Sequence, residues 1–255
     1  MATHLRFFGA AAFEIVTPQG LRVLIDPFLD ENPASPVKVR DLERADLVLV
    51  THGAWDHLGD AATIAARDGA PVVCGPEVKE ALTLGGLPPE QVLQLAWGMV
   101  VEFRGLRVRP VETRHTSRVR LPDGRWATGL PMGFIVSVDE RTRIYHLGDT
   151  ALFSDLRLIG ELYRPNIGLV HVALPDVIAA GDARVVTGEL TPYEAALACQ
   201  WLGLDVAIPC HFLDVHCDEV RQFTSLLAQM QADGRATVKP VVLPPGAWWT
   251  WDEER

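Results

Sequence analysis

The 255-residue sequence predicts an α/β fold in which two sheets pack face to face with helices outside, a four-layer αβ/βα sandwich. Short apolar runs separated by turn residues open the chain, and strands then alternate with helices in two successive rounds. His and Asp residues also recur directly after predicted strands. Alternation alone would equally allow a doubly wound sheet. The recurring His and Asp residues favour the sandwich, because packed sheets can gather strand ends at a common edge.

The N-terminal part of the chain is rich in predicted strands. Short apolar runs end at Gly, Pro or Asp, as half-buried strands do, and two longer stretches have helical composition. Strands are predicted at residues 5–9, 12–17, 21–26, 47–50, 71–74, 91–95, 100–103 and 106–111, and helices at 58–67 and 76–84.

Predicted strands and helices continue to alternate over the rest of the chain. Thr191 followed by Pro192 predicts a helix start, with Thr as N-cap and Pro at the first helical position. Residues 176–189 read as a loop long enough to serve as a lid. No linker is visible, so a single domain covering residues 1–255 is expected. Strands are predicted at 131–138, 143–147, 167–174, 206–209 and 238–243, and helices at 155–163, 193–202 and 219–232.

Composition narrows the class of protein. A net charge of −10 without a basic stripe disfavours a nucleic-acid surface. No apolar run approaches the roughly 20 residues needed to span a bilayer, so no membrane partner is expected. The first residues lack a signal-peptide pattern, and the four cysteines form no Cys-x-x-Cys pair. We therefore expect free thiols and a cytoplasmic protein with a small-molecule substrate, and the sequence leaves a homo-oligomer open.

The recurring His and Asp residues are the candidate site. Imidazole and carboxylate ligands without a thiolate cluster suit zinc, manganese or iron in a catalytic site that keeps an open position. Each residue alone reads as an ordinary surface or capping residue, and it is the repetition after four strands that indicates a metal centre. The candidate ligands are His52, Asp56, His57, His115, Asp149 and His211.

Five motifs carry a family resemblance that spans nearly the whole chain. They are Thr-His-Gly-Ala-Trp-Asp-His-Leu-Gly-Asp at 51–60, Arg-His-Thr-Ser at 114–117, Pro-Met-Gly-Phe at 131–134, Tyr-His-Leu-Gly-Asp-Thr at 145–150 and Ile-Pro-Cys-His-Phe at 208–212. In order and spacing the sequence resembles the metallo-β-lactamase superfamily, and within it the ascorbate-6-phosphate lactonase-like proteins. The resemblance is specific for the fold and weak for the substrate, because one scaffold hosts several reactions.

The resemblance implies two metal positions that share Asp149, one from His52, His115 and the residue at position 54, and one from Asp56, His57 and His211. Position 54 departs from the pattern, because Ala54 stands where the family motif has a second histidine. A methyl group cannot bind a metal, so one or two divalent ions per chain are expected, zinc first and manganese or iron as alternatives. Three explanations stay open: an introduced substitution, a natural one-metal variant, or a decayed site kept for binding.

The function implied by the resemblance is a metal-dependent hydrolase that activates water against a small ester, lactone or phosphate ester. The resemblance assigns Asp56 two roles, metal ligand and proton shuttle. A catalytically silent metal- or ligand-binding protein of the same fold is the alternative, and a nuclease-like phosphodiesterase is disfavoured by the acidic charge. Four further residues are candidates for contacts behind the ligands or in the substrate pocket: Ala54, Trp55, His146 and His171.

Overall fold

A computed structural model describes residues 2–173, 177–186 and 188–252. The chain divides into two compact units, each assembled from separate stretches of sequence. Unit 1 comprises residues 1–100, 116–132 and 243–255, and unit 2 comprises residues 101–115 and 133–242. Neither unit is therefore one continuous half of the sequence, and the single domain at 1–255 stays a prediction.

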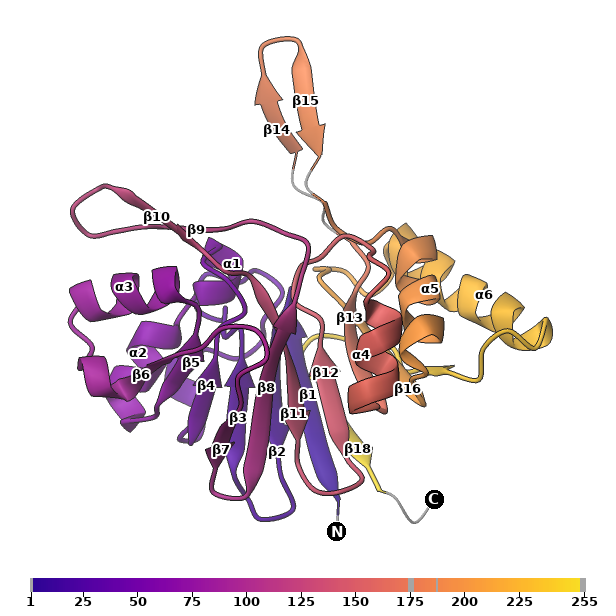
Figure 1. Cartoon of the computed structure of the whole chain (residues 1–255), viewed down its shortest axis with the longest axis horizontal. Coiled ribbons are helices and arrows are strands. Elements are labelled where there is room, and N and C mark those ends of the chain that lie inside the picture. Colours follow the sequence, from indigo (N-terminus) through magenta and orange to yellow (C-terminus); the bar gives the residue numbers. More distant parts are fainter. Residues whose placement is uncertain (1, 174–176, 187, 253–255) are drawn as a thin grey trace. The chain divides into compact units, whose positions relative to one another are not determined.

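Among the described residues, unit 1 contains a seven-stranded mixed sheet. The first three strands of the chain form an antiparallel meander, and the next three continue the sheet in parallel with the third. The last strand of the chain closes the other edge by antiparallel pairing with the first. In sheet order (Figure 1) the strands are β18 (Trp248–Trp251), β1 (Thr3–Gly9), β2 (Ala12–Val16), β3 (Arg22–Ile25), β4 (Leu47–Leu49), β5 (Val72–Cys74) and β6 (Val92–Gln94).

Two helices of unit 1 bury apolar side chains against this sheet. Ile64 of α2 (Ala61–Asp68) and Val78 of α3 (Pro76–Leu84) share one buried cluster with Val48 and Val72 of the central strands. A β-hairpin of β9 (Ser117–Arg120) and β10 (Trp126–Gly129) lies against α3. Unit 1 also contains helix α1 (Trp55–Leu58) and the 3₁₀ turns η1 (Val39–Asp41) and η2 (Pro89–Gln91).

The prediction of one continuous helix at 58–67 is wrong at its start. The structure breaks the helix between α1 and α2, at Gly59 and Asp60. Gly59 has a positive φ of 40°, and a Cβ there would lie 2.7 Å from the carbonyl oxygen of Pro27. The Asp60 carboxylate accepts hydrogen bonds from the backbone N–H groups of Leu29 and Asp30. The break therefore follows from a contact with the loop after β3, which helix propensity does not record.

Unit 2 also contains, among its described residues, a seven-stranded mixed sheet. Four of its strands run parallel, so their carboxyl ends lie at one edge of this sheet. In sheet order the strands are β17 (Lys239–Pro240), β16 (Val206–Cys210), β13 (Ile167–His171), β12 (Arg143–His146), β11 (Met132–Ser137), β8 (Leu106–Glu112) and β7 (Val101–Phe103). All of them except β17 are labelled in Figure 1.

The helices of unit 2 are α4 (Leu156–Tyr163), α5 (Pro192–Leu202) and α6 (Asp218–Ala232). The predicted start of α5 is confirmed, because Thr191 and Glu194 form a reciprocal capping box and Pro192 is the first helical residue. The expected loop at 176–189 is wrong in its centre, where β14 (Val177–Ala180) pairs with β15 (Ala183–Val186). Residues 176 and 187 lie outside the described residues.

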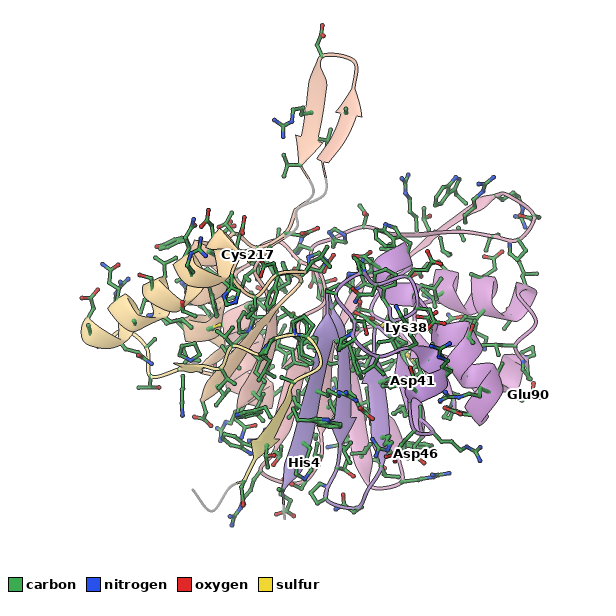
Figure 2. The ribbon with its side chains drawn as sticks, turned by 180° about the vertical axis from the view of Figure 1, so that it is seen from behind. His4, Lys38, Asp41, Asp46, Glu90 and Cys217 are labelled. Atoms are coloured by element: carbon green, nitrogen blue, oxygen red, sulfur yellow. The ribbon has the colours of Figure 1, made fainter. Side chains whose placement is uncertain are left out.

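All four cysteines are free thiols, as predicted. Cys74, Cys199 and Cys210 are buried, whereas Cys217 is half-buried directly before α6 (Figure 2). Within the described residues, no helix is both long and apolar enough to cross a membrane.

Candidate metal centre

In unit 1, three predicted ligands lie on the segment that links β4 to α1. His52 and His57 are almost fully buried, and the centroids of their rings are 4.1 Å apart. Asp56 is more accessible, with 21% of its side chain exposed, and its Oδ2 lies 3.8 Å from Nε2 of His57. Two zinc ligands at 2.0–2.1 Å from a tetrahedral ion are about 3.4 Å apart, so this carboxylate and imidazole are near the spacing that one ion requires.

A buried aspartate orients these imidazoles. Asp26 follows β3 directly, is fully buried, and accepts a 2.7 Å hydrogen bond on Oδ2 from Nδ1 of His57. Its two oxygens also accept from Thr51, Oδ1 from the backbone N–H and Oδ2 from the hydroxyl. The Thr51 hydroxyl lies 3.1 Å from Nδ1 of His52. Because Asp26 engages Nδ1 of His57, the ring presents Nε2 to a metal, and this carboxylate–imidazole pairing is typical behind metal ligands.

In unit 2, Asp149 is the centre of the remaining predicted ligands. Its Oδ2 lies 3.5 Å from Nε2 of His211 and 4.0 Å from Nε2 of His115. The segment that carries His115 is tied to the Asp149 loop through Arg114, whose N–H donates to Thr150 Oγ1 and whose carbonyl accepts from the N–H of Ala151. These two hydrogen bonds keep His115 beside Asp149.

His211 has the features of an oriented metal ligand. Its Nδ1 donates a 2.7 Å hydrogen bond to the carbonyl of Ala173, which leaves Nε2 on the side of Asp149. Its φ is +65°, in the left-handed region that residues other than glycine rarely adopt. Asp26 in unit 1 shares this conformation, with a φ of +48°. Unfavourable backbone of this kind concentrates at functional sites.

His171, one of the secondary candidates, holds the backbone of unit 2 rather than a metal. Its Nδ1 donates to the carbonyl of Gly148, and its Nε2 accepts from the N–H of Leu190, both at 2.8 Å. The second bond requires a neutral ring, and burial lowers the pKa of His171 to about 3, against the opposing effect of the Asp149 charge. The His171 imidazole therefore holds the backbone at Gly148, directly before Asp149, and at Leu190, directly after Glu189.

Glu189 joins this cluster although no sequence motif points to it. Its carboxylate, the Asp149 carboxylate and the His115 imidazole have ligand atoms that all lie within 4.8 Å of one another. The side chains of Asp149 and Glu189 are 6% and 4% exposed. Two ionised carboxylates at this separation repel each other by about 3 kcal/mol at an effective dielectric constant of 20. Such a pair is stabilised by a bound cation.

These observations show that the donor sets fit a divalent metal. The imidazoles of His57 and His211 have Nδ1 engaged and Nε2 within 4 Å of a carboxylate, an arrangement typical of metal-ligating histidines. The six predicted ligands fall into one set in unit 1 and one in unit 2, and their joint role as ligands stays a prediction. Imidazole and carboxylate donors suit zinc, manganese and iron alike.

The other secondary candidates have different surroundings. Ala54 is half-buried and is the N-cap residue of α1. Trp55 is 71% exposed and packs edge-on against Phe28, with ring centroids 5.1 Å apart. His146 is buried, and its Nδ1 accepts a hydrogen bond from the N–H of Gly148. This hydrogen bond, like the one from His171, holds the backbone at Gly148, next to Asp149.

Sequence reasoning missed two residues of these sets. Asp26 closes a predicted strand, so the rule that picked out the other aspartates and histidines could have included it. Glu189 precedes a helix cap and follows no predicted strand, so the sequence carried no comparable signal for it.

We expect the substitution His171→Ala to lower the free energy of unfolding by about 2–4 kcal/mol, because it leaves two buried backbone groups without their hydrogen bonds. Urea denaturation of the purified protein measures this. The exposed His216 offers a matched control, and His216→Ala is expected to change stability by less than about 0.5 kcal/mol. A loss below about 1 kcal/mol for His171→Ala would show that the ring does not secure these loops.

Comparison with known proteins agrees with this chemistry. The model of the β-lactamase superfamily domain matches residues 21–212. A UPF0173 metal-dependent hydrolase from Rubrobacter xylanophilus is 37% identical over 211 residues, 82% of this chain and 81% of that protein. The UPF0173 metal-dependent hydrolase MK1542 from Methanopyrus kandleri is 40% identical over 210 residues, 82% of this chain and 84% of that protein.

The fold is equally well matched. The structure of Igni18, a metallo hydrolase from Ignicoccus hospitalis, superimposes with a TM-score of 0.75 at 27% identity and covers 99% of both chains. The predicted α/β fold of the metallo-β-lactamase type is thereby confirmed. This chain belongs to the UPF0173 family of metal-dependent hydrolases within the metallo-β-lactamase superfamily.

Proposed function

We propose that the protein hydrolyses a small ester, lactone or phosphate ester with a divalent metal held by His52, Asp56, His57, His115, Asp149 and His211. The observation that carries the proposal is the oriented imidazoles, each with Nδ1 engaged and Nε2 beside a carboxylate. A bound divalent ion would supply hydroxide at neutral pH and would withdraw charge from the substrate's reacting oxygen. Zinc is the first metal to test, followed by manganese and iron.

Asp56 is the residue proposed to move the proton. Its carboxylate is the most accessible of the unit 1 set, with 21% of the side chain exposed, so water and substrate can reach it. His57 is fully buried and held by Asp26, which suits a fixed ligand rather than a mobile base. We therefore assign Asp56 the roles of ligand and proton shuttle, and His57 the role of ligand alone.

The substrate class rests on the resemblance to ascorbate-6-phosphate lactonase-like proteins, which makes lactones the first compounds to assay. We further propose that the protein acts in the cytoplasm, in keeping with its four free cysteines. Ala54 supports one alternative, a catalytically silent binding protein, because it removes an imidazole from the family motif.

The test is a hydrolysis panel of lactones, carboxylic esters and phosphodiesters, run on protein stripped with a chelator and on protein reloaded with zinc, manganese or iron. We expect turnover that disappears on stripping, returns on reloading, and falls at least a hundredfold in Asp56→Asn. That size follows from the loss of a positioned proton-transfer group, about 10²–10⁴-fold. Bound metal with no turnover of any compound would favour the silent binding protein.

A further inference from the structure

A buried hydrogen-bonded pair, Ser117 and Glu77, contacts the loop that carries His52. We propose that this pair positions His52 for metal binding, with Ser117 in contact with the loop and Glu77 acting through Ser117. All three residues belong to unit 1. The inference rests on the proposed function, since it concerns the position of one of the proposed ligands.

Ser117 holds the peptide that joins His52 to Gly53. It is the first residue of β9 and is only 4% exposed. Its Oγ accepts a 3.0 Å hydrogen bond from the backbone N–H of Gly53. A Cβ on Gly53 would lie 2.9 Å from the carbonyl oxygen of Arg118, so the loop packs directly against the backbone of β9. The backbone of His52 is therefore fixed by β9 on its C-terminal side.

Glu77 determines which way the Ser117 hydroxyl points. The hydroxyl donates its only proton to Oε1 of Glu77, so its lone pairs accept the N–H of Gly53. The other carboxylate oxygen, Oε2, accepts a 3.2 Å hydrogen bond from the N–H of Leu130, directly after β10. Because both oxygens accept, an amide at this position breaks a bond in either orientation.

The surroundings of Glu77 are shaped to hold a carboxylate. The residue is 1% exposed and lies in the first turn of α3, where the helix dipole favours a negative charge. Two glycines leave room for it: a Cβ would lie 1.7 Å from Oε2 at Gly129 and 2.8 Å at Gly75. An apolar side chain would pack α3 against the hairpin without the desolvation that a carboxylate requires. The contact with Ser117 explains why a carboxylate stands here.

The test measures zinc affinity and stability separately in Glu77→Gln, Ser117→Ala, the double variant and Asp68→Asn. Each protein is stripped with a chelator and titrated with zinc by calorimetry, and urea denaturation in chelator gives its free energy of unfolding. Asp68→Asn is the matched control. Asp68 is also a buried carboxylate of unit 1, at the end of α2, and it accepts hydrogen bonds from Ala45 and Arg67 rather than from the metal loop.

We expect Glu77→Gln and Ser117→Ala each to weaken zinc binding by about 10–100-fold, the range for groups that orient metal ligands. The double variant should bind zinc about as weakly as the weaker single variant, because both substitutions break the same chain of hydrogen bonds. Asp68→Asn is expected to lose stability and to keep its zinc affinity.

Ser117→Thr retains the hydroxyl and is expected to bind zinc like the starting protein. This conservative variant separates the loss of the hydrogen bond from a general disturbance of β9. If Glu77→Gln does not fold, the comparison of Ser117→Ala with Ser117→Thr tests the pair at its point of contact with the loop.

Three results would overturn the inference and leave the proposed function standing. The first is that Glu77→Gln and Ser117→Ala lose stability but bind zinc like the starting protein, so that the pair supports only the fold. The second is an equal loss of zinc affinity in Asp68→Asn, which would trace the loss to general destabilisation. The third is that the two single losses multiply in the double variant, which would show that Glu77 does not act through Ser117. A starting protein that binds no zinc, manganese or iron would overturn the proposed function and this inference together.

Discussion

Replacing Asp149 with asparagine is expected to abolish the stabilisation of the folded protein by metal. In chelator at pH 8, above the ordinary imidazole pKa of about 6.5, the variant should unfold at or above the temperature of the wild type. The reason is that Asp149 and Glu189 are both buried with ligand atoms within 4.8 Å of each other, and two carboxylates at this separation repel by about 3 kcal/mol when both are ionised, at an effective dielectric constant of 20. Asparagine has a similar shape and removes one of the two charges.

With metal present, the wild type should unfold at a higher temperature than Asp149→Asn. An ion at 100 times its dissociation constant stabilises the folded protein by about 2.7 kcal/mol, which raises the unfolding temperature of a chain of this size by about 5–10 °C. We expect the wild type to show this rise and Asp149→Asn to show almost none. Differential scanning calorimetry measures the unfolding temperature of both proteins in chelator and in excess zinc.

Asp155→Asn is the control for this experiment. Asp155 is an exposed aspartate at the start of α4, and its replacement is expected to leave the zinc-induced rise unchanged. A full rise in Asp149→Asn would exclude Asp149 as a ligand. A variant that is less stable than the wild type in both arms would show that the Asp149 carboxylate has a structural role that outweighs its repulsion with Glu189.

Local signals explain what could be predicted from the sequence. The run at 47–50 is apolar and β-branched, and it forms β4. Thr191 and Pro192 begin α5 as expected, because a capping box and a first-turn proline act within a few residues. The motif histidines and aspartates follow strands in both units. Their position directly after a predicted strand was therefore enough to identify them, although the sequence does not show which of them lie together.

Contacts between distant residues explain what could not be predicted. Gly59 and Asp60 interrupt a helical stretch because they contact the loop after β3, some thirty residues earlier. Glu189 lies beside Asp149, forty residues away in sequence, and only the folded chain shows the two carboxylates together. His171 lies within the apolar run that forms β13, and its two hydrogen bonds to loops outside this strand define its role.

Asp26 is the unit 1 residue whose replacement is expected to have the largest effect on the metal site. The substitution Asp26→Asn places an amide where both carboxylate oxygens accept hydrogen bonds, from His57 and from two groups of Thr51. In either orientation the amide NH₂ faces a donor, so at least one buried group loses its acceptor. We expect a loss of about 2–3 kcal/mol in urea denaturation and zinc binding 10–100-fold weaker by titration calorimetry.

Asp60→Asn is the control for Asp26→Asn, whose two expected effects are a loss of stability and a loss of zinc affinity. Asp60 also secures backbone through its carboxylate, and one oxygen accepts both bonds from Leu29 and Asp30, so asparagine can keep them. Zinc affinity should therefore be unchanged in Asp60→Asn. If Asp26→Asn loses stability and keeps wild-type zinc affinity, Asp26 supports only the fold. A parallel loss of both would mean that the orientation of His57 depends on its bond to Asp26, because Nε2 binds zinc only when the proton stays on Nδ1.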